Sequence, residues 1–100
     1  MTERPIDRIK MLADWLIENG VIKSIYAFER VCGLSKLYVR NLLATQKGNP
    51  GIEVVARIYD VFPMVSIEWL VTGRGNMWKR KGDDEDIANA VKQILLMKLI

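Results

Sequence analysis

The sequence predicts an all-α protein built from several short helices. Apolar residues recur at the helical spacing of three and four positions, and no stretch of useful length alternates polar and apolar residues as a half-buried strand does. The chain has 100 residues, which suits one domain, and half of them are hydrophobic, which allows a buried core. We therefore expect a compact helical bundle.

The first two helices are expected to begin and end at recognisable residues. The first covers about residues 5–19, where Pro5 suits the first helical turn and Gly20 permits a left-handed ending. Ser24 can cap a second helix over about residues 25–32. Their predicted inner faces are apolar: Ile6, Ile9, Ala13, Leu16 and Ile17 in the first, and Ala27, Phe28, Val31 and Cys32 in the second.

A tight turn is expected between the second helix and a third one. Gly33 allows a positive φ, which most residues resist, and Ser35 can cap the next helix, expected over about residues 36–44. Two short helices joined in this way are typical of a helix-turn-helix. The residues expected to fix their angle are Phe28, Cys32, Leu34, Val39 and Leu42.

Two more short helices are expected downstream. The GNPG stretch at residues 48–51 indicates a loop. A fourth helix over about residues 52–61 follows, and its expected apolar stripe is Ile52, Val55, Tyr59 and Phe62. Ser66 can cap a fifth helix, closed by Gly73, whose expected core residues are Trp69, Leu70 and Val71. Residues 73–82, with their glycines and basic side chains, indicate a turn and a tail.

The last segment, residues 83–100, is expected to form an additional C-terminal amphipathic helix. Its four acids come first and its two lysines later, which suits the helix macrodipole. Its apolar stripe needs a partner surface: Ile87, Ala90, Val91, Ile94 and Leu95. Three arrangements remain open, namely contact with a second copy in a dimer, packing back on the domain, and a frayed end.

Composition argues against several classes of function. The chain has no histidine, which removes His general bases, His-based triads and nearly every catalytic zinc site. The single cysteine, Cys32, lies on an apolar stripe, so we expect it to be buried rather than reactive. A phosphate-binding glycine loop is absent too. We therefore expect no enzyme activity, no metal or other cofactor and no small-molecule substrate.

The expected location is the cytoplasm. The N-terminal stretch is charged and lacks the apolar run of a secretory signal, and no apolar run approaches the roughly 18 residues of a membrane span. Residues 1–82 contain 13 basic and 8 acidic residues, a net charge of +5, against −2 for the rest. A mildly basic body suggests nucleic acid only weakly.

The third helix leaves one polar face free, and this face has the chemistry of DNA recognition. A helix fits the major groove and reads base edges with its N-terminal half. Arg40 can pair with guanine, Asn41 with adenine, and Leu37 can meet a thymine methyl group. The alternative is an ordinary solvated face. The predicted DNA contacts are Ser35, Lys36, Leu37, Tyr38, Arg40, Asn41, Ala44, Thr45, Gln46 and Lys47.

Two segments, FERVCGLSKLYVRNLL and VFPMVSIEWLVTGRGNMWK, resemble the lambda repressor-like (Xre/Cro) helix-turn-helix family. Within it they look most like small phage CI-type repressor domains of Bacteroidetes. The resemblance covers about residues 6–79 and implies a five-helix domain, residues 1–80, that binds double-stranded operator DNA as a homodimer and regulates transcription. The chain departs from the family pattern at Glu29, where a small residue is usual. A glutamate that points outward there would weaken binding to phosphates.

A second hypothesis comes from a different class, the protein-interaction module. In it a helix-turn-helix-like bundle docks on another protein through its apolar C-terminal helix, as an antirepressor or an antitoxin does. Glu29 and the modest net charge of +3 favour it. The two hypotheses differ in their consequences, since a DNA regulator loses affinity steeply as salt rises. A docking module binds DNA weakly and forms a tight protein complex.

Overall fold

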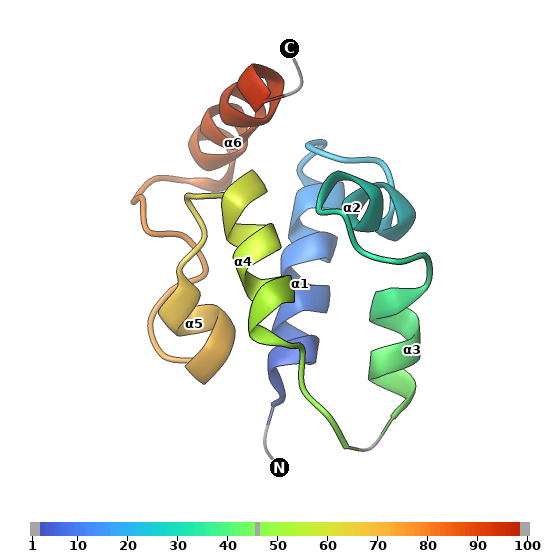
Figure 1. Ribbon diagram of the computed structural model, residues 1–100. Helices are drawn as coiled ribbons and strands as arrows, with labels where there is room; N and C mark the ends of the chain where they lie inside the picture. The colour runs from blue at the N-terminus through green and yellow to red at the C-terminus, as the bar shows by residue number, and fades with distance from the viewer. Residues whose placement is uncertain (1–2, 46, 99–100) are drawn as a thin grey trace.

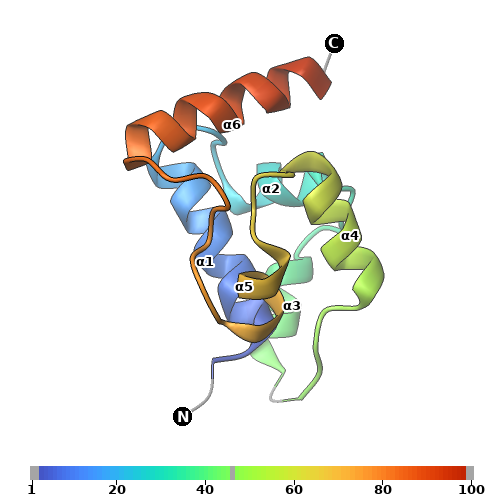
Figure 2. The same cartoon turned by 90° about the vertical axis from the view of Figure 1, so that its left-hand side faces the viewer.

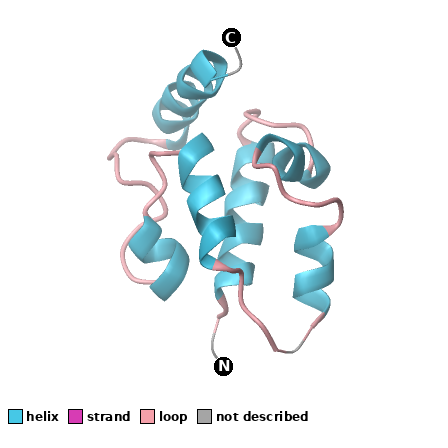
Figure 3. Cartoon of the chain, viewed as in Figure 1, coloured by secondary structure: helices cyan, strands magenta, loops and turns pink. Residues whose placement is uncertain are grey.

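The computed structural model describes residues 3–45 and 47–98. Within them the chain folds into α1 (Pro5–Glu18), α2 (Ile25–Val31), α3 (Tyr38–Ala44), α4 (Ile52–Val61), α5 (Ile67–Thr72) and α6 (Asp84–Lys98). The described residues contain helices and loops but no strand, as Figure 3 shows, which confirms the all-α prediction. Helix α4 has the expected bounds, and the other helices differ from the expected ones by one or two residues at an end; α3 begins two residues later than expected.

The helices surround α1, which contacts α2, α3 and α5. In Figure 1, α2 and α3 lie on one side of α1 and α5 lies on the other, while α6 crosses the end of the bundle. Figure 2 shows the same crossing from the side. The rings of Phe28 and Phe62 stack in the core with centroids 6.1 Å apart. The largest fully buried side chains are Phe28, Phe62, Ile6, Ile9, Leu12, Leu16, Ile58, Leu70, Val39 and Val65.

The buried face of α4 differs from the expected one. Ile58 and Phe62 are buried, whereas Ile52 is 88% exposed and Tyr59 is 38% exposed. The prediction was therefore wrong for Ile52 and Tyr59, and in α5 it was wrong for Val71, which is 46% exposed. Several apolar residues are adjacent in the sequence of α4. Two apolar stripes, which differ by one residue or about 100° around the helix axis, therefore fit the helical spacing equally well. The packing of Ile58 against the core selects one of them.

The segment after α5 is more ordered than a tail. Ser66 N donates to Met77 O at 2.8 Å, and Lys79 N donates to Met64 O at 2.9 Å. Trp78 lies in this segment and is buried, and its ring centroid lies 4.8 Å from that of Trp15. The absence of a helix here was predicted correctly, but the buried tryptophan was missed.

Helix α6 packs back on the domain. Ile87, Val91 and Leu95 belong to the same buried cluster as the core of α1, and Ala88 is buried beside them. Packing on the domain, one of the three arrangements left open, is therefore confirmed for the inner face of α6, and contact with a second copy stays a prediction. The outer side of α6 still exposes Leu96 and Met97, and Met97 is 73% exposed.

Candidate nucleic-acid interface

The connection between α2 and α3 is a tight turn with two left-handed residues. Gly33 has φ 70°, as expected, and Leu37 has φ 65°, which is unusual for a residue with a side chain. Leu37 is the N-cap of α3, so the helix begins at Tyr38. The predicted cap at Ser35 and the predicted start at Lys36 were therefore wrong. Leu37 makes no side-chain cap bond of its own, and another residue supplies one.

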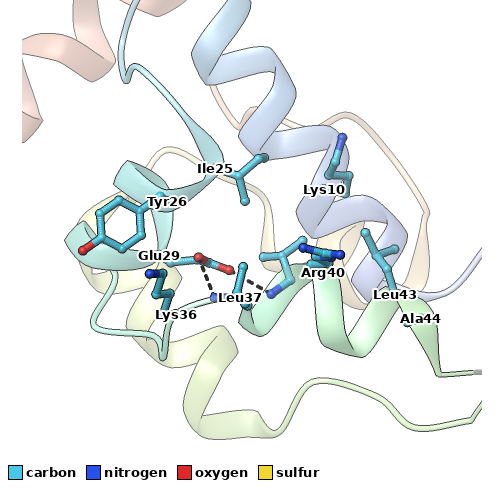
Figure 4. A pocket seen from close by; sticks show the side chains of 10 residues that line it. Lys10, Ile25, Tyr26, Glu29, Lys36, Leu37, Arg40, Leu43 and Ala44 are labelled. Carbon is cyan, nitrogen blue, oxygen red and sulfur yellow. Dashed lines mark hydrogen bonds between the residues drawn. The ribbon is translucent and has the colours of Figure 1, made fainter.

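That residue is Glu29 on α2. Its side chain is almost completely buried, at 2% exposure. One carboxylate oxygen accepts from Leu37 N at 3.1 Å and the other accepts from Val39 N at 3.0 Å, as the dashed lines in Figure 4 show. A negative charge at a helix N-terminus is favourable, because free N–H groups point towards it. Glu29 thus points inward and stabilises the first turn of α3 instead of facing phosphates.

The C-terminal end of α3 is held by Arg4, which precedes α1. Its guanidinium donates to Thr45 O at 2.8 Å and to Leu43 O at 3.2 Å. Seven residues make a helix about 10 Å long, and a helix this short does not persist alone in water. Contacts from Glu29 at one end and Arg4 at the other therefore fix α3 in place.

The side of α3 that faces away from the core carries the central predicted contacts. Val39 is its buried residue, and Leu42 and Leu43 are partly buried around it. At about 100° per residue, Asn41 and Ala44 project on the opposite side. Both are exposed. The other exposed residues from the predicted set are Ser35, Lys36, Leu37, Arg40, Thr45 and Lys47.

Tyr38, Thr45 and Gln46 require separate comment. Tyr38 is partly buried against the core, and burial raises the pKa of its phenol. Thr45 Oγ1 lies 2.7 Å from both Leu42 O and Lys47 O, so its proton donates inside the loop. The hydroxyl predicted to hold a phosphate is thus already engaged. Gln46 lies outside the described residues.

Three cations around α3 form no ion pair with an acidic side chain among the residues that the structure describes. The ion pairs among the described residues are Arg4–Asp7, Arg8–Glu3, Lys10–Asp14 and Arg57–Glu53. Lys36, Arg40 and Lys47 belong to none of them. These three cations remain available to an anionic partner.

The sequence alone did not predict that an aromatic side chain of α2, Tyr26, contacts the cations beside α3. Lys36 Nζ and Arg30 Cζ both lie 5.9 Å from the ring centroid of Tyr26, which is half exposed. Such cation–π contacts hold flexible cations near one place. The local signal was the four-residue spacing of Tyr26 and Arg30, which puts them on one helical face.

The described residues offer little for metal or thiol chemistry. No three of their His, Cys, Asp or Glu side chains lie together in a way that could hold a metal ion. Cys32 is buried, as predicted, and burial raises the pKa of its thiol to about 12. The thiol therefore stays protonated in the folded protein at neutral pH.

Comparisons with protein-family models, with curated proteins and with solved structures found no match for this chain. Among the helices described, none has the length and hydropathy needed to cross a membrane.

Proposed function

We propose that this protein is a sequence-specific DNA-binding regulator of transcription, of the lambda repressor-like helix-turn-helix type, which inserts α3 into the major groove. The observation that carries this proposal is that Glu29 and Arg4 hold both ends of α3 while its outward side stays exposed. Base recognition needs a helix that is fixed in place and exposed on one side, because each base edge offers donors and acceptors at fixed positions.

The exposed side chains divide into two roles. Arg40 and Asn41 read bases, since a guanidinium pairs bidentately with guanine and an amide with adenine, and Leu37 meets a thymine methyl group. Lys36 and Lys47 bind phosphates and set the register without reading sequence. A second copy of the chain on a palindromic site supplies the other half-site contact.

The test is fluorescence anisotropy with a labelled pool of random-sequence duplexes at low and at physiological salt. The proposal predicts binding that weakens steeply with salt, because each neutralised phosphate releases counterions. It also predicts a tighter subset of duplexes, which can be selected and sequenced to give the binding site. Absence of binding even at low salt contradicts the proposal.

A protein-docking role is the second candidate, and one observation favours it. Leu96 and Met97 are exposed on α6, next to an apolar hollow of about 300 Å³ that Val21 and Leu95 help to line. Light scattering after size exclusion tests self-association through this surface. If the wild type is a dimer and Leu96→Asp is a monomer, α6 is the dimer contact. An unchanged dimer rejects that contact.

A further inference from the structure

A cavity of about 560 Å³ opens between α1, α2 and α3, beside the proposed DNA-binding face. Ligand pockets for small molecules have volumes of roughly 300–1,000 Å³. Much of its lining is apolar, from Ile25, Val39 and Leu43. Glu29 also lines the cavity, but both its carboxylate oxygens accept N–H groups of the first turn of α3. The cavity thus has the size and the apolar walls of a small-molecule site.

The charged groups at the cavity select the sign of a ligand. Lys10, Lys36 and Arg40 all line it. Figure 4 shows Lys36 near Tyr26 and Lys10 on the opposite side, with Arg40 nearer to Lys10. Lys10 Nζ lies 2.7 Å from Asp14 Oδ2, so its charge is offset. Lys36 and Arg40 have no acidic partner among the described residues. An apolar cavity with two free cations suits an apolar molecule with one anionic group.

We propose that this cavity binds an amphipathic carboxylate, that is, an alkyl or aryl chain that ends in one carboxylate group. The chain packs against Ile25, Val39 and Leu43. The carboxylate pairs with Arg40, while the positive charge of Lys36 across the cavity also favours an anionic ligand. Bonds from a guanidinium to a carboxylate are charge-assisted and stronger than neutral ones. Because Arg40 also belongs to the outward side of α3, a bound carboxylate displaces DNA. This last consequence rests on the proposed function, whereas the binding site itself does not.

The test is isothermal titration calorimetry of the full chain with decanoate below its micelle concentration, and with neutral 1-decanol. The proposal predicts saturable binding of one decanoate. The double variant Lys36→Gln/Arg40→Gln should bind decanoate about tenfold more weakly but decanol equally well, because only the charged contacts are lost. Its matched control, Arg74→Gln/Lys81→Gln, also removes two positive charges, but from residues that do not line the cavity. This control should bind decanoate like the wild type.

A cavity-filling variant, Ala44→Phe, tests the location. Ala44 lines the cavity and is exposed at the end of α3, so a larger side chain there should block both ligands. Absence of saturable decanoate binding overturns the proposal, and so does equal weakening in the two double variants. If decanoate does not bind and Ala44→Phe converts a dimer into a monomer, a second copy of the chain fills the cavity instead.

Competition with DNA is measured separately, by adding decanoate to the complex with a selected duplex. Release of the duplex over the concentration range in which decanoate saturates the site in calorimetry supports the mutual exclusion, and the control Arg74→Gln/Lys81→Gln should release it over the same range. A duplex that stays bound at saturating decanoate refutes the exclusion and leaves the site in place. Decanoate binding by a chain that binds no DNA refutes the proposed function alone.

Discussion

Helices α3 and α5 are almost equally short but are held in different ways. In α5, Ser66 caps the first turn by accepting from Trp69 N at 3.1 Å, and Trp69 and Leu70 are buried. In α3, the N-cap residue Leu37 makes no side-chain cap bond, and Val39 is the buried residue. The N-terminal cap of α5 comes from the residue next to it, whereas that of α3 comes from Glu29 on another helix. The C-terminal ends do not differ in this way, because each is held by an arginine from α1 or just before it, α3 by Arg4 and α5 by Arg8.

The difference shows how a short helix can be fixed without burying it. A helix with two large buried side chains has less surface left for a partner. Polar contacts at the ends of α3 replace part of that burial and leave Arg40, Asn41 and Ala44 exposed. The arrangement carries a cost, because the stability of α3 then depends on a few remote side chains. Substitutions of those side chains therefore test directly whether α3 and α5 are stabilised in different ways.

The largest effect is expected for Glu29→Ala. It leaves the N–H groups of Leu37 and Val39 without their acceptor, and we expect a loss of about 2–4 kcal/mol in the free energy of unfolding. Urea unfolding followed by circular dichroism measures it. The matched control is Glu68→Ala, an exposed glutamate in the first turn of α5, which should remain close to the wild type. Equal stability of the two variants would show that Glu29 does not hold α3.

Arg8→Met should have the next largest effect. The guanidinium of Arg8 is buried and donates to Leu70 O and Val71 O, both at 2.9 Å, and to Glu3 Oε1 at 2.9 Å. We expect a loss of about 1–3 kcal/mol, because the end of α5 loses its donors. DNA affinity below the unfolding transition should not change, since α3 is not involved. A variant that unfolds like the wild type contradicts the role given to Arg8.

The two serine substitutions Ser66→Ala and Ser35→Ala sharpen the comparison. Loss of the cap at Ser66 should cost about 1 kcal/mol. Ser35 does not cap α3, so its substitution should leave stability within about 0.5 kcal/mol of the wild type. The same urea series measures both. A larger cost at Ser35 than at Ser66 would restore the sequence-based assignment of the cap.

The last prediction concerns the thiol of Cys32, next to the α2–α3 turn, and its effect is confined to alkaline pH. Burial raises its pKa from 9.0 to about 12, so the unfolded chain ionises first as pH rises. The resulting stabilisation is complete below about pH 9 and is lost between about pH 9 and 12. Unfolding free energies of the wild type and Cys32→Ala across this range measure it. A difference between them that stays constant with pH contradicts the burial effect.

Local signals in the sequence predicted the helices and some of the caps. Ser24 accepts from Ala27 N at 3.0 Å and Ser66 caps α5, both as expected from residues beside their helices. The contacts that were missed join distant residues. Arg8 and Leu70 are 62 positions apart, and nothing near either residue indicates the other.

The sequence predicted the exposed residues of the candidate site, but it did not predict the contacts that hold α3 in place. The exposure of Arg40, Asn41 and Ala44 follows from helical periodicity, which the sequence contains. The role of Glu29 does not, because a glutamate on a short helix is normally solvated. Its inward orientation depends on the left-handed Leu37, which directs two N–H groups towards α2.

The central claim is that the outward side of α3 reads DNA, and one measurement tests it most directly. Fluorescence anisotropy compares the affinity of the wild type, Arg40→Ala and Arg74→Ala for a duplex selected from the random pool. Arg74 directly follows the last turn of α5, and Figure 1 shows α5 on the opposite side of α1 from α3. We predict that Arg40→Ala loses about 1–3 kcal/mol of binding free energy while Arg74→Ala binds like the wild type. Equal affinities for all three proteins would contradict the account.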